Sequence, residues 1–365
     1  MGGRPRSVED LVTSGRLPDA AFWRGRRVLL TGHTGFKGGW LALWLERLGA
    51  RVHGLALPPE GTPSLYALAQ IEAVTGPGFG DIRDMETVRH AYAQGDPEIV
   101  LHMAAQPLVH EGYRTPEATF ATNVLGTAHV LGAARGTGVR AIVAVTTDKV
   151  YHNREWLYPY REDDRLGGRD PYSASKAAAE LVIDCYRASY LAADKIAVAS
   201  ARAGNVVGGG DWSADRLIPD AVRAWGQKRV LDIRCPGATR PWQHLLEPLA
   251  GYLLLAERLH TDPSAANAWN FGPEPGEAAT VRTVIEHARA AWGQAEVRFG
   301  TGGVGPHEAG WLALETVKAR RELGVVPRWN LPQTIARTIA WYREQADGAD
   351  ARALCQADID AYEAA

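Results

Sequence analysis

The chain has 365 residues, of which 46% are hydrophobic and 22% charged, and its net charge is −2 at pH 7. This balance is ordinary for a globular protein, and it excludes the global basic charge that binding to nucleic acid or an anionic membrane favours. The three cysteines form no CxxC pair, which excludes a disulfide framework and a zinc site, so we predict no metal. No apolar run reaches the roughly 18 residues of a membrane span, and no signal peptide is recognisable. We therefore expect a cytoplasmic protein.

Short apolar segments alternate with amphipathic ones along the first half of the chain. The expected strands are Arg27–Thr31, 51–57, 98–102 and 141–146, and the strongest expected helices are 39–48, 119–134 and 172–190. The strands are nearly continuous apolar runs, which is typical of parallel strands covered on both faces. Strands that alternate with helices indicate right-handed βαβ units. The predicted fold class is therefore α/β, with a doubly wound parallel sheet.

The sequence pattern changes after Asn205: turns rich in glycine and proline divide the chain into shorter expected elements. We predict that residues 22–205 form the doubly wound domain, with later segments interleaved. Residues 206–345 are expected to form mainly a smaller substrate-binding domain over the carboxyl ends of the strands. An N-terminal extension over residues 1–21 and a C-terminal tail over 346–365, expected to be a peripheral helix, complete the predicted organisation.

A glycine-rich turn, TGHTGFKG at residues 31–38, follows the first strand and opens the first helix. Gly32 permits the tight turn, Gly35 lets the backbone approach a pyrophosphate, and Gly38 lets helix and strand pack closely. The amide groups at the start of the helix suit phosphates. The motif predicts a dinucleotide bound to a Rossmann sheet, and its expected contacts in this turn are Gly32, Thr34, Gly35, Phe36, Lys37 and Gly38.

The adenosine end of the predicted cofactor site lacks one expected feature. An acidic residue often follows the second strand and binds the ribose, but residues 55–59 read LALPP. This position therefore does not decide between NAD and NADP. Asp81, followed by Ile82, is a candidate contact for the adenine, and a role as a turn residue is the equal alternative.

Tyr172 and Lys176 lie at positions i and i+4 of a predicted helix and so share one face. An ammonium beside a phenol lowers the pKa of the phenol, which lets Tyr172 act near neutral pH. A tyrosine on a helix is more often packed than catalytic. Its combination with the glycine-rich turn favours catalysis.

The segment TTDKVY at residues 146–151 ends a strand, and ligands sit at the carboxyl ends of parallel strands. Thr147 offers a hydroxyl for the reacting oxygen. Asp148 is a candidate general acid, and Lys149 is a second proton-transfer group. A solvated Asp–Lys turn is the alternative.

Together these motifs resemble the extended short-chain dehydrogenase/reductases, and within that group the CDP-glucose 4,6-dehydratases. The resemblance runs from about residue 22 to about residue 341. It is carried by TGHTGFKGGWL, HMAAQPLV, TNVLGT, TTDKVY, GRDPYSASK, RAGNVVGGGDW and RPWQH. Most sugar-nucleotide 4,6-dehydratases have Asp-Glu where this chain has Asp148-Lys149, and the CDP-glucose branch resembles it in having Asp-Lys.

The resemblance implies a reaction as well as a fold. NAD would be a bound cofactor, and CDP-glucose would lose water to give a CDP-4-keto-6-deoxy sugar. Tyr172 would take the proton of the 4-hydroxyl while Lys176 tunes it and contacts the nicotinamide ribose. Asp148 would protonate the departing 6-hydroxyl, and Lys149 would either take the carbon-5 proton or steady the enolate. Ala104 and Ala105, in HMAAQPLV, would also contact the cofactor.

The resemblance also implies substrate contacts and an assembly. The expected substrate-binding residues are Asn205, Arg216, Arg240, His244, His307 and Glu308. Salt bridges for the arginines and structural roles for the histidines are the alternatives. A homodimer would form through the helices at 119–134 and 172–190. A related nucleotide-sugar dehydratase or epimerase, and a catalytically silent NAD-binding protein, remain the competing interpretations.

Overall fold

A computed structural model describes residues 15–301 and 310–365 of the chain. Within these residues, a six-stranded sheet forms the centre of the molecule, and all its neighbouring strands are parallel. Its strands lie in the order β10 (Ala268–Phe271), β5 (Ala197–Ala203), β4 (Ala141–Val145), β3 (Ile99–His102), β1 (Arg27–Thr31) and β2 (Arg51–Leu55). The prediction of a doubly wound parallel sheet is confirmed.

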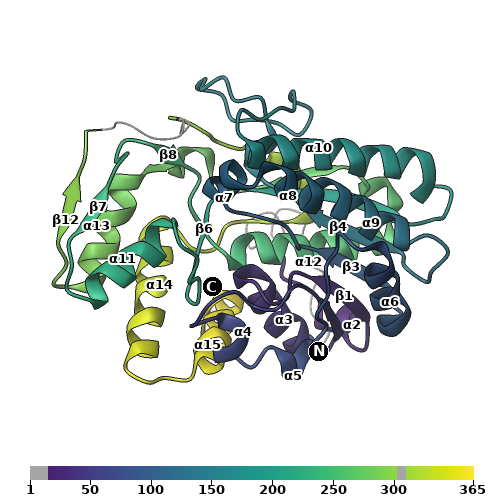
Figure 1. Cartoon of the computed structure of the whole chain (residues 1–365), viewed down its shortest axis with the longest axis horizontal. Coiled ribbons are helices and arrows are strands. Elements are labelled where there is room, and N and C mark those ends of the chain that lie inside the picture. The colour runs from purple at the N-terminus through teal and green to yellow at the C-terminus, as the bar shows by residue number, and fades with distance from the viewer. Residues whose placement is uncertain (1–14, 302–309) are drawn as a thin grey trace, which may run out of the picture.

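Helices cover both faces of this sheet (Figure 1). Side chains alternate along a strand, so Val28 and Leu30 join one apolar core while Leu29 joins the other. The first core includes α2 (Ala20–Trp23), α3 (Phe36–Arg47) and α12 (Leu246–Thr261). The second includes α6 (Met85–Gly95), α9 (Gly126–Ala133) and α10 (Pro171–Tyr186). Burial on both faces explains why the strands read as continuous apolar runs.

The helices differ from the predictions mainly at their ends and in two π-helical turns. The helix expected at 119–134 is α8 (Pro116–Phe120), the π-helix η1 (Ala121–Leu125) and α9, and that expected at 172–190 is α10 followed by the π-helix η3 (Arg187–Leu191). A π-turn inserts an extra residue, which an apolar repeat does not reveal. Helix α3 begins at Phe36 rather than residue 39, because the glycine-rich turn opens it directly.

The chain after β5 builds an irregular half beside the carboxyl ends of the strands. Its elements are α11 (Leu217–Gly226), α13 (Val281–Trp292) and the strand pairs β6 (Val206–Val207) with β9 (Gln243–His244), β8 (Thr239–Arg240) with β11 (Ala279–Thr280), and β7 (Leu231–Ile233) with β12 (Val297–Phe299). Between them, α12 and β10 return to the central sheet. The predicted domain boundaries themselves stay a prediction.

The C-terminal segment is part of the core rather than a peripheral helix. Helices α14 (Leu331–Ala346) and α15 (Ala351–Ala364), yellow in Figure 1, pack against each other, and α15 contacts α3 from the start of the chain. Cys355 and Ile359 of α15 are fully buried. The Trp44 indole donates to Glu363 at 2.8 Å. This helix therefore closes the first core.

The described part of the predicted N-terminal extension is also held in place. The Arg16 amide donates to the Gly324 carbonyl at 2.7 Å, and the Asp19 amide donates to the Glu257 carboxylate at 2.7 Å. The shorter elements of the structure are α4 (Leu65–Leu68), α5 (Glu72–Thr75), α7 (Val109–Arg114), η2 (Asp148–Val150), η4 (Pro263–Ala265), η5 (Pro275–Glu277) and η6 (Ala319–Leu323). Among the described residues, no helix is both long and apolar enough to cross a bilayer.

Candidate active site

A cleft follows the carboxyl ends of the strands, where the parallel sheet meets the irregular half of the molecule. This is the edge at which ligands bind in open α/β sheets. The predicted residues that line the cleft are Gly32, Thr34, Gly35, Phe36, Lys37, Gly38, Asp81, Ile82, Ala104, Ala105, Thr147, Lys149, Tyr172, Lys176, Asn205, Arg216 and Arg240. Asp148 lies directly beneath this lining and is fully buried.

The glycine-rich turn leaves the start of α3 open to the cleft. Gly32 has a φ of +81°, and a Cβ atom there would lie 2.8 Å from the Ala104 amide. A Cβ atom on Gly38 would lie 2.1 Å from the Gly32 carbonyl oxygen, whereas one on Gly35 would stay 3.4 Å from it. Gly35 is the N-cap of α3, and no side chain caps the helix. The turn therefore presents backbone amides and open space, which fit a pyrophosphate.

The side chain of Lys37 faces inward from this turn. Its ammonium donates to the Tyr252 hydroxyl at 3.0 Å. Burial, together with the charges of Arg216 and Lys176, lowers the pKa of Lys37 to about 7. The sequence did not indicate Tyr252, because this residue lies 215 positions away on α12. Because its ammonium is bound to Tyr252, Lys37 is better placed to contact a phosphate through its backbone than through its side chain.

At the adenosine end of the cleft, the carboxylate of Asp81 already has partners within the protein. Asp81 accepts from the Arg83 amide at 2.8 Å and pairs with the Arg83 guanidinium at 2.5 Å, which lowers the pKa of Asp81. Ile82 is buried against Gly126. His33, in the turn after β1, is fully buried with its ring against Gly54 of β2, and this burial lowers its pKa to about 4. The carboxylate of Asp81 thus serves the turn before α6, although the residue still lines the cleft.

The turn after β4 gathers three polar side chains. Thr147 donates to Oδ1 of Asp148 at 3.0 Å. The Lys149 ammonium lies 3.5 Å from the same carboxylate oxygen and 3.5 Å from Oδ1 of Asn205. The other oxygen of Asp148, Oδ2, is buried and has no hydrogen-bond partner among the described residues. A buried acceptor without a partner is costly, so Oδ2 is available to a ligand hydroxyl.

Tyr172 and Lys176 lie on the first turns of α10, which Asp170 caps by accepting from the Ser173 amide at 2.9 Å. The Thr147 hydroxyl interacts with the Tyr172 phenol and acts to lower its pKa. The expected lowering of the Tyr172 pKa is absent: burial raises it to about 12, against the effect of Thr147. Burial outweighs nearby charge, and the Lys176 ammonium donates to the Val145 carbonyl at 2.9 Å. Burial also lowers the pKa of Lys176 to about 8.

Asn123 joins the loop after β3 to this helix. It accepts from the Gln106 amide at 2.9 Å and donates to the Ser175 hydroxyl at 2.8 Å. It also donates to the Gln106 carbonyl at 3.1 Å. Asn123 lies within the π-helix η1 and not at a helix N-cap. The π-turn thus carries a buried amide that fixes the neighbour of Lys176.

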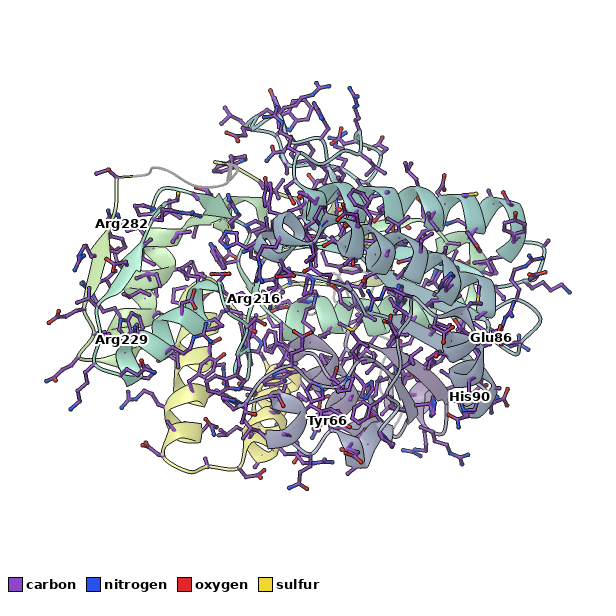
Figure 2. All side chains as sticks on the ribbon, in the orientation of Figure 1. Tyr66, Glu86, His90, Arg216, Arg229 and Arg282 are labelled. Atoms are coloured by element: carbon purple, nitrogen blue, oxygen red, sulfur yellow. The ribbon has the colours of Figure 1, made fainter. Side chains whose placement is uncertain are left out.

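The substrate side of the cleft is more scattered. Arg216 pairs with Asp211 at 2.8 Å, and its positive charge acts to lower the pKa of both Tyr172 and Lys37. Figure 2 shows Arg216 near the middle of the molecule, between the two halves. Arg240 is buried and donates to the Thr239 carbonyl at 2.8 Å. Arg216 therefore lies within electrostatic reach of the tyrosine as well as the cleft.

The structure corrects the prediction for His244. Its ring is fully buried between Trp40 and Trp329, with ring centroids 6.0 and 4.8 Å away. Its Nδ1 accepts from the Leu246 amide at 3.3 Å, and burial lowers its pKa to about 3. A neutral, enclosed imidazole outside the cleft packs the core. The predicted contacts His307 and Glu308 lie outside the described residues.

Comparison with known proteins gives a consistent family. Residues 29–338 match the family model for GDP-mannose 4,6 dehydratase. The chain is 44% identical to a CDP-glucose 4,6-dehydratase of Salmonella typhimurium, over 94% of this chain and 98% of that protein. It is 27% identical to a dTDP-glucose 4,6-dehydratase of Streptomyces griseus, over 87% and 94% of the two chains.

Solved structures share the fold over most of their length. A dTDP-glucose 4,6-dehydratase of Streptomyces venezuelae, with NAD and TYD bound, has a TM-score of 0.74 and 26% identity, over 88% of this chain and 98% of that one. A UDP-glucose-4-epimerase of Stenotrophomonas maltophila with bound NAD has a TM-score of 0.75 and 23% identity, over 89% and 100% of the two chains. The likeness to the epimerase concerns the fold alone.

Proposed function

Because the chain belongs to the GDP-mannose 4,6 dehydratase family, we propose that it removes water from CDP-glucose to give a CDP-4-keto-6-deoxy sugar. The observation that carries this proposal is the 44% identity with a CDP-glucose 4,6-dehydratase along almost the whole of both chains. The Asp148–Lys149 pair at the cleft supports it, because an acid and a second proton-transfer group are what loss of water requires.

NAD is the proposed cofactor. The cradle of Gly32, Gly35 and Gly38 at the uncapped start of α3 supports it, as does NAD in the related dehydratase from Streptomyces venezuelae. Bound NAD would accept a hydride from carbon 4 of the sugar and return it to carbon 6, so that none is consumed. Asp81, Ile82, Ala104 and Ala105 are the proposed contacts beyond the turn.

Tyr172 is the proposed base for the proton of the sugar 4-hydroxyl. Its pKa of about 12 keeps the phenol protonated at neutral pH unless positive charge gathers beside it. Arg216 already lowers this pKa, and Lys176 is one helical turn away. Thr147 lines the cleft, interacts with Tyr172 and is the proposed second contact to the same sugar oxygen.

Asp148 is the proposed acid that protonates the departing 6-hydroxyl. Its buried Oδ2 has no hydrogen-bond partner among the described residues, so this oxygen is free to carry the proton and to donate it to the departing sugar oxygen. Lys149 lies 3.5 Å from Asp148 and would either take the carbon-5 proton or steady the enolate. Asn205, Arg216 and Arg240 are the proposed contacts to the nucleotide and its diphosphate.

A homodimer in the cytoplasm completes the proposal. Phe120, Leu125 and Leu181 are exposed apolar side chains on α8, η1 and α10, which pack against each other. Exposed apolar groups gathered on neighbouring helices favour burial against a second copy. Sedimentation of the protein tests this, with a dimer expected for the natural chain and dissociation expected for Leu125→Glu. A natural chain that sediments as a monomer would contradict it.

Mass spectrometry of the products tests the proposed reaction. Purified protein is incubated with NAD and, separately, CDP-, UDP-, dTDP- and GDP-glucose. We expect loss of one water from CDP-glucose, with no accumulation of NADH. Water loss from another nucleotide sugar would keep the chemistry and overturn the substrate. An unchanged mass with all four would overturn the dehydration, and an epimer assay would then separate an epimerase from a silent binder.

A further inference from the structure

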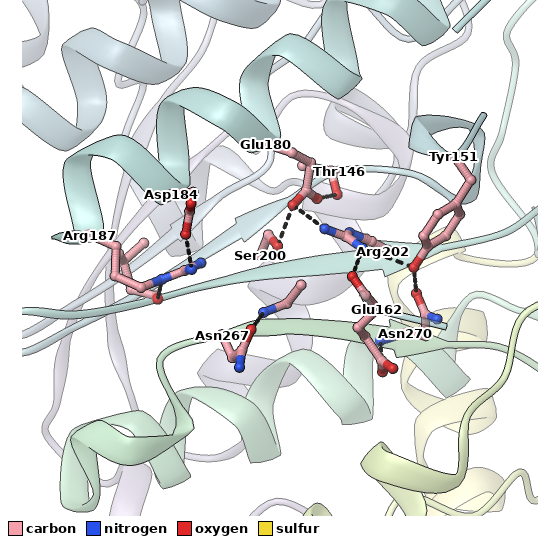
Figure 3. Close-up of polar contacts among 12 residues, drawn as sticks. Thr146, Tyr151, Glu162, Glu180, Asp184, Arg187, Ser200, Arg202, Asn267 and Asn270 are labelled. Carbon is pink, nitrogen blue, oxygen red and sulfur yellow. Dashed lines mark hydrogen bonds and ion pairs between the residues drawn. The ribbon is translucent and has the colours of Figure 1, made fainter. Parts of the chain in front are cut away.

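A buried ion pair joins α10 to the strands behind the catalytic turn (Figure 3). Glu180 lies one helical turn after Lys176. Its carboxylate accepts from the Thr146 hydroxyl at 2.5 Å, the Ser200 hydroxyl at 2.7 Å and the Arg202 guanidinium at 2.8 Å. The charged groups of Glu180 and Arg202 are only 3% and 4% exposed. None of the chemical steps proposed above uses this pair.

The two members of the pair hold opposite ends of the catalytic turn. Thr146, which Glu180 binds, comes directly before Thr147 and Asp148. Tyr151 follows Lys149 and Val150, and its hydroxyl accepts from Arg202 at 3.0 Å. The same hydroxyl donates to Asn270 of β10 at 2.6 Å. One ion pair therefore clamps the turn that carries the acid and the second proton-transfer group.

Successive turns of α10 also fix the helix to the end of β4. The Lys176 ammonium donates to the Val145 carbonyl at 2.9 Å, and one turn later Glu180 accepts from Thr146. These neighbouring contacts set the position of Tyr172 relative to the residues that follow β4. Proton transfer requires atoms within hydrogen-bond reach, so this placement bears directly on the reaction.

The carboxylate also balances positive charge. Burial lowers the pKa of Lys176 to about 8, and the charge of Glu180 acts in the opposite direction. Lys37 of α3 and His102 of β3 also interact electrostatically with Lys176, and burial keeps His102 neutral with a pKa of about 3. The groups that interact with Glu180 itself include Arg202 of β5 and Arg187 of η3. None of these other groups supplies Lys176 with a negative charge.

We propose that Glu180, paired with Arg202, is a positioning residue of the reaction: it anchors α10 to the catalytic turn and is the counter-charge of Lys176. The proposal rests on the proposed function for the meaning of that geometry. This role differs from packing, because it makes the protonation of Lys176 depend on the charge of Glu180.

Competitive acetylation across a pH series tests the counter-charge without any substrate. Acetic anhydride labels the purified protein, and the extent of modification at Lys176 gives its pKa, with Lys149 as an internal reference. We expect Glu180→Gln to lower the pKa of Lys176 by about one unit or more, whereas Glu180→Asp keeps it near the natural value. Asp184→Asn, one turn further along α10 where the side chain is exposed, is the matched control and should change nothing.

We then measure kcat of the same variants as a function of pH. A protonated Lys176 is lost as pH rises through its pKa, so Glu180→Gln should move the basic limb of the profile to lower pH by a matching amount. Glu180→Asp should reduce kcat without moving the limb. Should Glu180→Gln fail to fold, Arg202→Met carries the complementary test: it leaves the charge of Glu180 without its partner, so the pKa of Lys176 should rise. An unmoved pKa of Lys176 in whichever of these folds would overturn the proposal.

The two measurements separate this proposal from the proposed function. If the natural protein leaves CDP-glucose unchanged while acetylation shows the predicted shift, the reaction is wrong and the charge coupling stands. If the natural protein dehydrates CDP-glucose while Glu180→Gln leaves the Lys176 pKa unchanged, the coupling is wrong and the reaction stands.

Discussion

The two walls of the cleft are built in different ways. On the sheet side, Gly32, Ala104 and Thr147 belong to turns that directly follow β1, β3 and β4, and adjacent parallel strands bring these turns together. On the other side, Arg216 and Arg240 come from short elements separated by long stretches of irregular chain. The sheet side shows that motifs at the ends of adjacent parallel strands come together without any further contacts between distant segments. The other side depends on contacts between distant segments.

The largest expected effect tests the sheet side of this comparison. Tyr172→Phe removes the hydroxyl that interacts with Thr147 and keeps the ring. Loss of a general base should lower kcat by about 10³-fold or more. Product formation by mass spectrometry measures this, with the melting temperature as a check on folding. A folded variant that retains a tenth of the natural kcat would remove Tyr172 from the mechanism.

The next effect concerns the acid. Asp148→Asn preserves the shape of the buried side chain but removes its acidic proton, so loss of water should fall by about 10²- to 10³-fold. Asp220→Asn is the control, because this carboxylate lines the same cleft but pairs with Arg223 and belongs to none of the proposed contacts. Full dehydration by Asp148→Asn would favour chemistry that needs no acid at this position.

A smaller effect compares two predicted substrate-binding residues: Arg216 lines the cleft, whereas His244 is buried in the core. Arg216→Met should raise KM for the nucleotide sugar by about 10-fold or more, since a charged hydrogen bond contributes about 1.5–3 kcal/mol. His244→Phe should leave KM unchanged and lower the melting temperature, because His244 only packs between Trp40 and Trp329. Steady-state kinetics and calorimetry decide this. A raised KM with unchanged melting in His244→Phe would return the histidine to the site.

The smallest effect compares two glycines of one turn. Gly38→Ala would force a methyl group against the Gly32 carbonyl and should destabilise the protein by about 1–3 kcal/mol. Gly35→Ala meets only an ordinary contact at 3.4 Å, so its melting temperature should hold while NAD binds more weakly. Calorimetry and NAD titration measure the pair. Equal loss of stability in both variants would contradict the distinct roles of the two glycines.

The sequence predicted the central fold well for a physical reason. Buried parallel strands are apolar on both faces, so their locations are visible without knowledge of their partners, and the right-handed crossover restricts the topology. The glycine-rich turn was also predicted from the sequence, because the backbone leaves no room for a Cβ atom at Gly32 or Gly38. The π-turns η1 and η3 were not predicted, since a single added residue barely disturbs an apolar repeat.

The parts that the sequence did not predict depend on long-range partners. Lys37 meets Tyr252 across 215 positions, and Trp23 meets Glu257 across 234. Glu180 has an unremarkable position in the sequence, and only the fold brings Arg202 to it. The pKa of Tyr172 was predicted in the wrong direction, because a helical repeat shows the neighbouring lysine but not the burial that outweighs it.

Transfer of deuterium from carbon 4 to carbon 6 tests the central claim most directly. CDP-glucose that carries deuterium at carbon 4 is incubated with the protein and NAD, and the product is analysed by mass spectrometry and NMR. The account predicts a product lighter by one water that retains the deuterium, now at carbon 6. A dehydrated product without deuterium, or a substrate changed only in configuration at carbon 4, would contradict an internal redox cycle in this cleft.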